Sequence, residues 1–189
     1  MKFYNDILKY VPKCPQEEKD KEMILSLIDL LKEKILDRST TFAHMSASGF
    51  VLNHDFTKVL LVYHNIFKSW AWTGGHADGD DDLFSVAKKE VMEETGLINL
   101  TPITEDIVSL EALPVYHHIK RGQYVSNHLH LNVTYVFVAS EDDHVRIKED
   151  ENSGVMWVPI VDLNDYVSEK QMIPVYEKII SHAKEIIKM

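Results

Sequence analysis

Three glutamates, Glu90, Glu93 and Glu94, are the side chains whose types and spacing most clearly indicate chemistry. At about 100° per residue, this spacing places all three on one side of a helix. Like charges at such spacing destabilise an isolated helix by about 0.2–0.5 kcal/mol per pair, and Lys89 offsets part of this through Glu93. A hard divalent cation offsets it better, because Mg²⁺ prefers carboxylate and phosphate oxygens. The alternative is a solvated acidic face, so the glutamates alone do not establish a metal site.

The element that must position these glutamates is a loop and helix within residues 74–97. Gly74 and Gly75 permit close approach of the backbone. The acidic run 80–82 offers a helix N-cap, and Gly96 stands where a C-cap glycine belongs. An apolar stripe holds the helix against the protein, and its members are Leu83, Phe84, Ala87 and Val91. We therefore expect a buried helix with one acidic side.

The rest of the chain combines helical and strand patterns. Apolar residues at helical spacing predict one helix over residues 18–37 and another that has Pro174 in its first position. Alternating or continuous apolar runs predict strands near residues 42–52, 58–64, 128–139 and 154–159. Strands dominate the middle of the chain and helices its ends, which is typical of an α+β or mixed α/β fold.

Composition excludes several classes of protein. The 189 residues include 30 acidic and 20 basic side chains, a formal net charge of −10, which disfavours nucleic acid as a partner. Cys14 is the only cysteine, so the chain forms no internal disulfide and no cysteine-rich zinc site. Because no stretch approaches 18 uninterrupted apolar residues and no secretory signal is recognisable, we expect a cytoplasmic protein without membrane partners.

The segment over residues 74–97 resembles the signature of the Nudix (MutT-like) hydrolase family, Gly-x5-Glu-x7-Arg-Glu-aliphatic-x-Glu-Glu-x-Gly-aliphatic. The matching positions here are Gly75, Asp81, Lys89, Glu90, Val91, Glu93, Glu94, Gly96 and Leu97. Two positions depart from the signature. Asp81 is one methylene shorter than glutamate, and Lys89 lacks the planar fork of the family's arginine. We expect both departures to alter the geometry or rate of the site, with Lys89 keeping a catalytic role, rather than to abolish metal binding.

The resemblance implies an α/β/α sandwich around a mixed β-sheet. We expect a helical N-terminal extension over residues 1–38, packed on a Nudix domain over residues 39–189 that includes the C-terminal helix. The first helix would either cap the substrate cleft or form the interface of a homodimer. The implied activity is metal-dependent hydrolysis of a diphosphate linkage in a nucleoside diphosphate derivative or a related small molecule, with Mg²⁺ or Mn²⁺ as the cofactor.

The resemblance also assigns roles to individual residues. Glu93 and Glu94 would be the main metal ligands, and Glu90 would be a ligand or the base that orients water. A backbone carbonyl at Gly75, or at its neighbour, would complete the metal site. The family often adds a glutamate from the loop before a late strand, and Glu151 is the best match for this catalytic residue. The alternative for Glu151 is a solvated turn.

Four more side chains are candidates for binding the substrate. His128 and His130 alternate with leucines, so they share one face of a strand and could line the cleft or bind a soft metal. The alternative is a polar sheet face covered by another element. Trp72 could stack on a base or simply pack, and His76 could reach a phosphate because it follows Gly75.

Two other functions are compatible with the same signature. One is a non-catalytic nucleotide-binding regulatory module with a degenerate site, which the departures at Asp81 and Lys89 would permit. The other is an isomerase of isopentenyl diphosphate. Isomerases of this fold use a catalytic cysteine beside the sheet, whereas Cys14 lies in the N-terminal extension.

Overall fold

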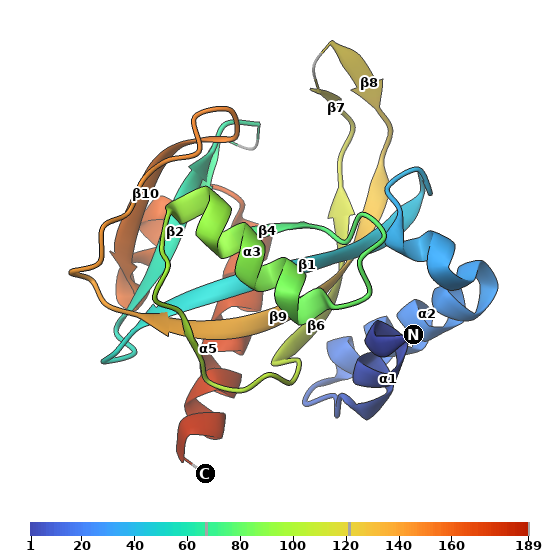
Figure 1. The fold of residues 1–189 in the computed structure, drawn as a ribbon, viewed down its shortest axis with the longest axis horizontal. Coiled ribbons are helices and arrows are strands. Elements are labelled where there is room, and N and C mark those ends of the chain that lie inside the picture. Colours follow the sequence, from blue (N-terminus) through green and yellow to red (C-terminus); the bar gives the residue numbers. More distant parts are fainter. Residues whose placement is uncertain (67, 121, 189) are drawn as a thin grey trace.

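The computed structural model describes residues 1–66, 68–120 and 122–188 (Figure 1). The α-helices are α1 (Lys2–Lys9), α2 (Pro15–Leu31), α3 (Leu83–Thr95), α4 (Leu163–Tyr166) and α5 (Ile173–Lys188). Short 3-10 turns cover Lys32–Leu36, Ile160–Asp162 and Lys170–Met172. The strands are β1 (Ala43–Asn53), β2 (Lys58–His64), β3 (Ser69–Ala71), β4 (Thr73–His76), β5 (Thr101–Pro102), β6 (Ser109–Val115), β7 (His118–Lys120), β8 (Gln123–Val125), β9 (His128–Ala139) and β10 (Asn152–Pro159).

One mixed sheet organises the fold, and β1 lies at its centre. The order is β10-β2-β1-β9-β5, with β6 also paired to β9, β3 to β2 and β4 to β1. β1 and β9 are parallel along their whole length, from Ala43 opposite Leu129 to Asn53 opposite Ala139, whereas the other strand pairs are antiparallel. The other edge of β1 is shared by two strands, because β4 pairs beside Ser46–Gly49 and β2 pairs beside Val51 and Leu52.

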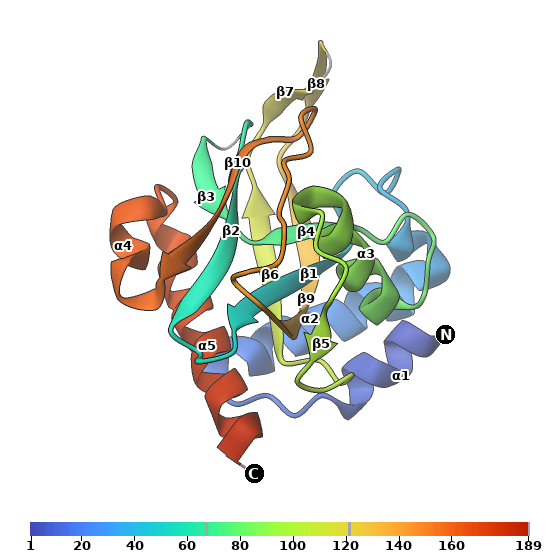
Figure 2. The same cartoon turned by 60° about the vertical axis from the view of Figure 1, so that its left-hand side comes forward.

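Helices cover both faces of this sheet (Figures 1 and 2). Side chains of β1 alternate between two cores: Met45 and Ala47 pack in the core that contains α1, α2 and α3, while Phe50 and Leu52 pack in the core that contains α5. Alternate side chains of this one strand therefore contribute to the hydrophobic cores on both faces of the sheet. The predicted α/β/α sandwich around a mixed sheet is confirmed.

The N-terminal segment is part of the first core. Phe3, Ile7, Ile24 and Ile28 are at most 1% exposed and join the cluster that α3 shares with β1 and β9. The sequence predicted one helix over residues 18–37. In the structure α2 begins three residues earlier and ends at Leu31, a 3-10 turn follows it, and α1 precedes it. Pro15 occupies the first turn of α2, where a missing N–H costs nothing.

The local signals around α3 predicted both ends of the helix correctly, but they assigned the wrong structure to the glycines that precede it. Asp82 caps the N-terminus by accepting a hydrogen bond from the Ser85 backbone N–H at 3.4 Å. Gly96 ends the helix with φ of 75°, a left-handed conformation that favours glycine. Gly74 and Gly75, which the sequence suggested as a loop, belong to β4, because the edge of β1 beyond β2 is open to pair with them.

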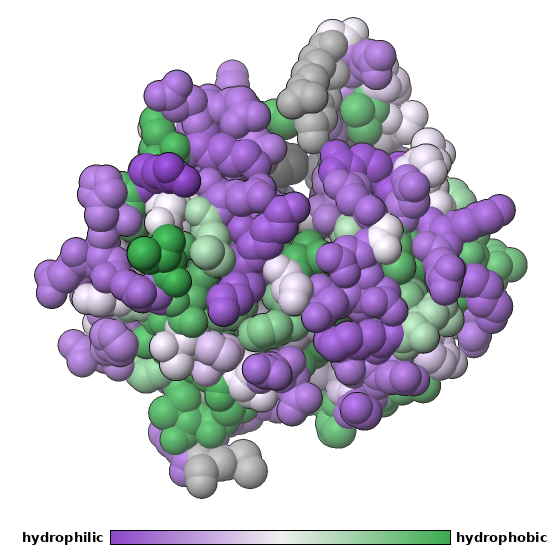
Figure 3. Space-filling view, viewed as in Figure 1, coloured by the Kyte–Doolittle hydropathy of each residue, from purple (hydrophilic) through white to green (hydrophobic). Residues whose placement is uncertain are grey.

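Hydrophilic side chains predominate on the face that carries α3 (Figure 3). Within the described residues, no helix combines the length and apolar character needed to cross a membrane.

Candidate functional site

Two of the three α3 glutamates are held against the backbone of β4. The Glu94 carboxylate is buried, and its Oε1 accepts a hydrogen bond from the Gly74 N–H at 2.9 Å. Glu90 lies against Gly75 so closely that a Cβ at that position would come within 2.3 Å of Glu90 Oε1. The absence of a side chain at Gly75 therefore lets Glu90 reach β4. Glu93 is on the outer side, with 43% of its side chain exposed.

A fourth carboxylate, Glu151, joins them from the loop that leads into β10. Its negative charge raises the pKa of both Glu90 and Glu94, which places it near both groups. We call Glu90, Glu93, Glu94 and Glu151 the α3 carboxylate cluster. The loop is attached to α3, because the Asn152 side-chain amide donates a hydrogen bond to the Glu94 backbone carbonyl at 3.2 Å.

The inner part of the α3 carboxylate cluster carries its charge at a high energetic cost. Burial raises the pKa of Glu94 to about 8, and the charges of Glu90 and Glu151 add to this. Burial also raises the pKa of Glu90, with Glu93 and Glu151 contributing. Desolvation disfavours the ionised form of a carboxyl group, and nearby carboxylates disfavour it further. The cluster is therefore electrostatically suited to receive a cation.

The nearest cation of the described chain is Lys148, which sequence reasoning missed. Its Nζ lies 2.9 Å from a Glu151 carboxylate oxygen and 3.6 Å from one of Glu93. It thus contacts the two outer members of the cluster. The only signal in the sequence was a lysine three residues before Glu151, and nothing in that spacing indicates which distant glutamate it would meet.

Of the two positions that depart from the signature, Lys89 contacts this cluster and Asp81 has a different partner. Lys89 is 68% exposed and its Nζ is 3.7 Å from Glu93, so it contacts only the outer side. Asp81 points elsewhere: its carboxylate accepts a hydrogen bond from the backbone N–H of Lys2 at 2.9 Å. The aspartate therefore anchors α1 to the loop that precedes α3.

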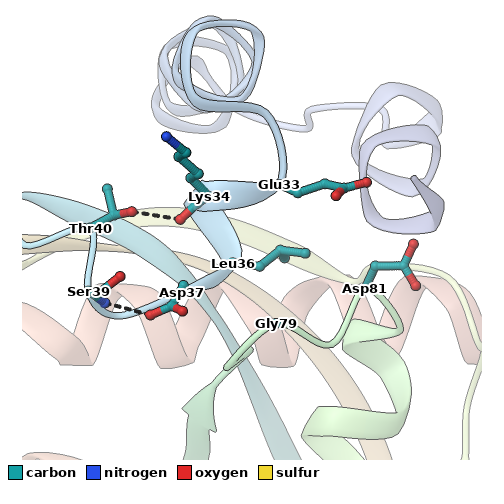
Figure 4. A pocket seen from close by; sticks show the side chains of 8 residues that line it. All are labelled: Glu33, Lys34, Leu36, Asp37, Ser39, Thr40, Gly79 and Asp81. Atoms are coloured by element: carbon teal, nitrogen blue, oxygen red, sulfur yellow. Dashed lines mark hydrogen bonds between the residues drawn. The ribbon is translucent and has the colours of Figure 1, made fainter.

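Asp81 also borders a surface hollow of about 770 Å³ between that loop and the segment after α2 (Figure 4). Its lining residues are Glu33, Lys34, Leu36, Asp37, Ser39, Thr40, Gly79 and Asp81. Side chains from the loop and the segment face each other across it, and Glu33, Asp37 and Asp81 make it predominantly acidic. None of these eight residues belongs to the α3 carboxylate cluster, and their charge is unsuited to a phosphorylated ligand.

Histidines gather on the other side of β4. Nitrogen atoms of His44, His76 and His130 all lie within 4.8 Å of one another. Three neighbouring strands bring them together, since His44 is opposite His130 in the β1–β9 pair and His76 is opposite Ser46 in the β1–β4 pair. His128 is adjacent, with its Nε2 3.3 Å from Nε2 of His130. Burial lowers the pKa of His130 to about 2 and also lowers the pKa of His44.

Trp72 has the contacts of a packing residue. Its ring lies near those of Phe50 and Tyr176, with centroid separations of 6.5 and 5.4 Å, and its backbone N–H donates to the Tyr176 hydroxyl at 3.2 Å. These partners belong to the core that contains α5. Stacking of Trp72 on a nucleobase, which the sequence suggested, stays a prediction. Cys14 directly precedes α2, and its Sγ is 3.9 Å from a side-chain oxygen of Gln16.

The two groups of ligating side chains differ in chemistry. The α3 carboxylate cluster offers only oxygen donors, together with backbone carbonyls of β4, and this set fits a hard cation such as Mg²⁺ or Mn²⁺. The histidines offer only nitrogen donors, which hard cations bind poorly. One short strand therefore separates an oxygen-donor group from a nitrogen-donor group.

Comparison with known proteins places the chain by sequence and by fold. The model of the family described as NUDIX domain matches residues 43–182. An Ap4A hydrolase from C. elegans in a binary complex has 17% identity and a TM-score of 0.53, covering 76% of this chain and 97% of its own. The dihydroneopterin triphosphate pyrophosphohydrolase of E. coli has 13% identity and the same TM-score of 0.53, covering 72% of this chain and 94% of its own. No curated protein sequence matches.

Proposed function

Because the chain belongs to the Nudix hydrolase family, as its sequence signature indicated, we propose that it hydrolyses a diphosphate linkage in a nucleoside diphosphate derivative, in a reaction that depends on Mg²⁺ or Mn²⁺. The family model covers residues 43–182, which include α3, β4 and the loop before β10. The solved structures with similar folds are named as enzymes that act on phosphoanhydrides. We use those names to choose substrates for testing, since identities below 20% support the fold alone.

The observation that carries this proposal is the state of the α3 carboxylate cluster. Glu94 is 4% exposed and accepts one hydrogen bond from a backbone amide, yet its pKa is raised to about 8. A protein that only needed a stable helix here gains nothing from such a buried charge. A cation that binds the cluster would restore the ionised form and stabilise the fold.

Glu90, Glu93 and Glu94 would hold the metal ion, with a carbonyl of Gly75 as a further ligand. When bound, a divalent cation neutralises diphosphate charge, polarises a phosphoryl oxygen and lowers the pKa of water. The fit is supported by the close contact between Glu90 and Gly75, which needs a residue without Cβ, and by the all-oxygen donor set.

The other residues of the site have roles that follow from their positions. Glu151 lies near the three α3 glutamates but comes from a different element, so it could accept a proton from water without being fixed on α3. Lys148 bridges Glu151 and Glu93 and would hold the Glu151 carboxylate in place beside the α3 glutamates. Lys148 and Lys89 also provide local positive charge where a chain of net charge −10 must admit an anionic substrate.

A substrate panel with phosphorus analysis tests the proposal. Dinucleoside polyphosphates, nucleotide sugars, ADP-ribose and nucleoside triphosphates would be incubated with Mg²⁺ or Mn²⁺ in ¹⁸O-water, and ³¹P NMR would show which phosphorus gains oxygen. We expect hydrolysis of at least one class, no reaction in EDTA, and a loss of about 10³-fold in Glu94→Gln, since metal ions supply several kcal/mol of transition-state stabilisation.

The matched control is Glu177→Gln, which neutralises an exposed carboxylate on α5 and should keep the wild-type rate. Glu151→Gln should lower turnover far more than it lowers metal affinity. Equal losses of both would make Glu151 a plain ligand instead. Binding of nucleotides without turnover of any substrate would overturn the proposal in favour of a non-catalytic regulatory module.

A further inference from the structure

The histidines behind β4 are arranged as ligands, and the first indication is the state of His44. This side chain is 4% exposed, and its Nε2 is buried without a hydrogen-bond partner in the part of the chain that the structure describes. Its Nδ1 is 3.2 Å from the Thr40 carbonyl oxygen. A carbonyl can only accept, so Nδ1 carries the proton and Nε2 presents a lone pair. Metal-binding histidines are commonly oriented through their second nitrogen in this way.

His128 repeats the arrangement. Its Nδ1 is 2.8 Å from the Ser126 carbonyl oxygen, which leaves the lone pair on Nε2. This Nε2 is 3.3 Å from Nε2 of His130. Two nitrogens bound to the same tetrahedral Zn²⁺ at about 2.0–2.1 Å lie about 3.3–3.4 Å apart. The separation of this pair therefore already suits a common ion.

We propose that His44, His76 and His130 bind one first-row transition-metal ion, with Zn²⁺ as the reference case and His128 placed to supply a fourth nitrogen. One nitrogen atom of each side chain lies within 4.8 Å of the other two, and binding a common ion would bring them to the separation of about 3.3–3.4 Å. Imidazole ligands suit Zn²⁺, Ni²⁺ and Cu²⁺ far better than Mg²⁺. Only histidines carry the proposal, which distinguishes this site from the oxygen-donor cluster.

The site is separate from the α3 carboxylate cluster although it is adjacent in sequence. Gly75 faces Glu90, and successive residues of a strand face opposite sides, so His76 faces away from α3. On β1 and β9, His44 and His130 likewise alternate with Met45 and Leu131, which pack in the core shared with α3. The two metal sites would therefore lie on opposite sides of β4, and loss of one does not remove the ligands of the other.

Metal titration of the tag-free chain tests this inference. After treatment with EDTA, calorimetry and elemental analysis should show one Zn²⁺ bound per chain in the presence of excess Mg²⁺. We expect His130→Leu and His44→Leu to weaken Zn²⁺ binding by about 100-fold or more, which exceeds the effect usual for residues that only orient a ligand. His54→Ala removes an exposed histidine in the turn after β1 and should bind Zn²⁺ like the wild type.

A measurement on the unmodified chain covers the case in which a variant does not fold. Cu²⁺ bound to the wild-type protein should give an electron paramagnetic resonance spectrum with hyperfine splitting from at least three imidazole nitrogens. Glu94→Gln should keep full Zn²⁺ affinity even where it abolishes hydrolysis, so failure of the proposed activity and failure of this site are distinguishable. Zn²⁺ binding that disappears in Glu94→Gln, or that survives in both histidine variants, would overturn the inference.

Discussion

Among the residues that the structure describes, buried carboxylates lie in two clusters, and the two clusters differ in how closely a lysine approaches the buried groups. In what we call the internal ion cluster, Glu17 of α2 and Glu111 of β6 are at most 1% exposed, and Lys178 of α5 lies 3.2 and 2.9 Å from them. In the α3 carboxylate cluster, Glu94 is almost as buried, but Lys148 forms ion pairs only with the outer Glu93 and Glu151. Its charge lowers the pKa of Glu94 without offsetting the effect of burial.

The pKa shifts of Glu17 and Glu94 run in opposite directions. Burial alone would raise the pKa of Glu17, but hydrogen bonds from the Lys13 backbone N–H and the Tyr10 hydroxyl, together with the charge of Lys178, lower it. Burial raises the pKa of Glu94 to about 8, and its one backbone hydrogen bond does not compensate. A buried carboxylate whose charge is satisfied internally supports the fold, whereas one whose burial outweighs the nearby positive charge indicates a ligand site.

The largest expected effect is on the cluster with the internal cation. Lys178→Met leaves two carboxylates buried together and should lower the free energy of unfolding by about 3–5 kcal/mol. The matched variant Lys148→Met removes a partly exposed ion pair and should cost about 1 kcal/mol or less. Urea denaturation in EDTA measures both. Equal losses would show that the two clusters do not differ in the way described.

Mg²⁺ should supply the missing cation to the α3 carboxylate cluster. At a concentration of about 100 times the dissociation constant, a ligand that binds only the folded state stabilises it by about 2.7 kcal/mol. We expect this gain in the wild type and in Glu17→Gln but not in Glu94→Gln. Thermal unfolding with and without Mg²⁺ provides the measurement, and a full gain in Glu94→Gln would contradict the assignment of this ligand.

The stability of the metal-free chain should depend on pH through Glu94. Because the folded-state pKa of Glu94 is raised from 4.5 to about 8, its contribution to stability is present below about pH 4.5 and is lost as pH rises toward 8. Each pKa unit corresponds to about 1.4 kcal/mol, so the loss should exceed that value. Glu94→Gln should abolish this decline. Chemical denaturation in EDTA between about pH 5 and 8 would show it, and a flat profile in the wild type would refute it.

Glu17 should produce the opposite dependence at lower pH. Its lowered folded-state pKa means that its contribution is present above about pH 4.5 and is lost as pH falls below that value. The same denaturation series, extended to acid and repeated with Glu17→Gln, separates the two contributions.

The smallest effect concerns Lys89. Restoring the arginine of the family signature in Lys89→Arg should raise turnover only severalfold, because the side chain is 68% exposed and an exposed ion pair contributes about 1 kcal/mol or less. An unchanged rate would count against any orienting role for this position. A change larger than about 10-fold would mean that position 89 reaches the substrate directly.

Much of the fold could be predicted because the strongest patterns are local. The strands over residues 58–64 and 128–139 have the bounds that their apolar runs indicated, and α3 begins and ends at its predicted caps. The strands β3 to β8 were missed, and Gly74 and Gly75 were assigned to a loop. Those glycines pair with β1 only because β2 leaves part of that edge open, which is a tertiary condition that no local pattern reports.

The site divides in the same way. The helical spacing of Glu90, Glu93 and Glu94 was sufficient to predict a shared side, since that relation is set by α-helix geometry. The meeting of His44 with His130 depends on the register of two parallel strands 86 residues apart, and neither histidine stands in a pattern that indicates the other. Lys148 is three residues from Glu151, but its second partner, Glu93, is distant in sequence and is reached only in the folded chain.

β4 has a thermodynamic consequence beyond its place in the sheet. Gly74 and Gly75 of this strand contact the carboxylates, and His76 belongs to the histidine group. The position of the same short strand therefore affects ion binding on both of its sides. If an ion bound on one side of β4 shifts this strand, it changes the affinity for an ion on the other side. Binding of that second ion must then change the affinity for the first by the same factor. In a diphosphate hydrolase built this way, the concentration of one metal would change the affinity for the other.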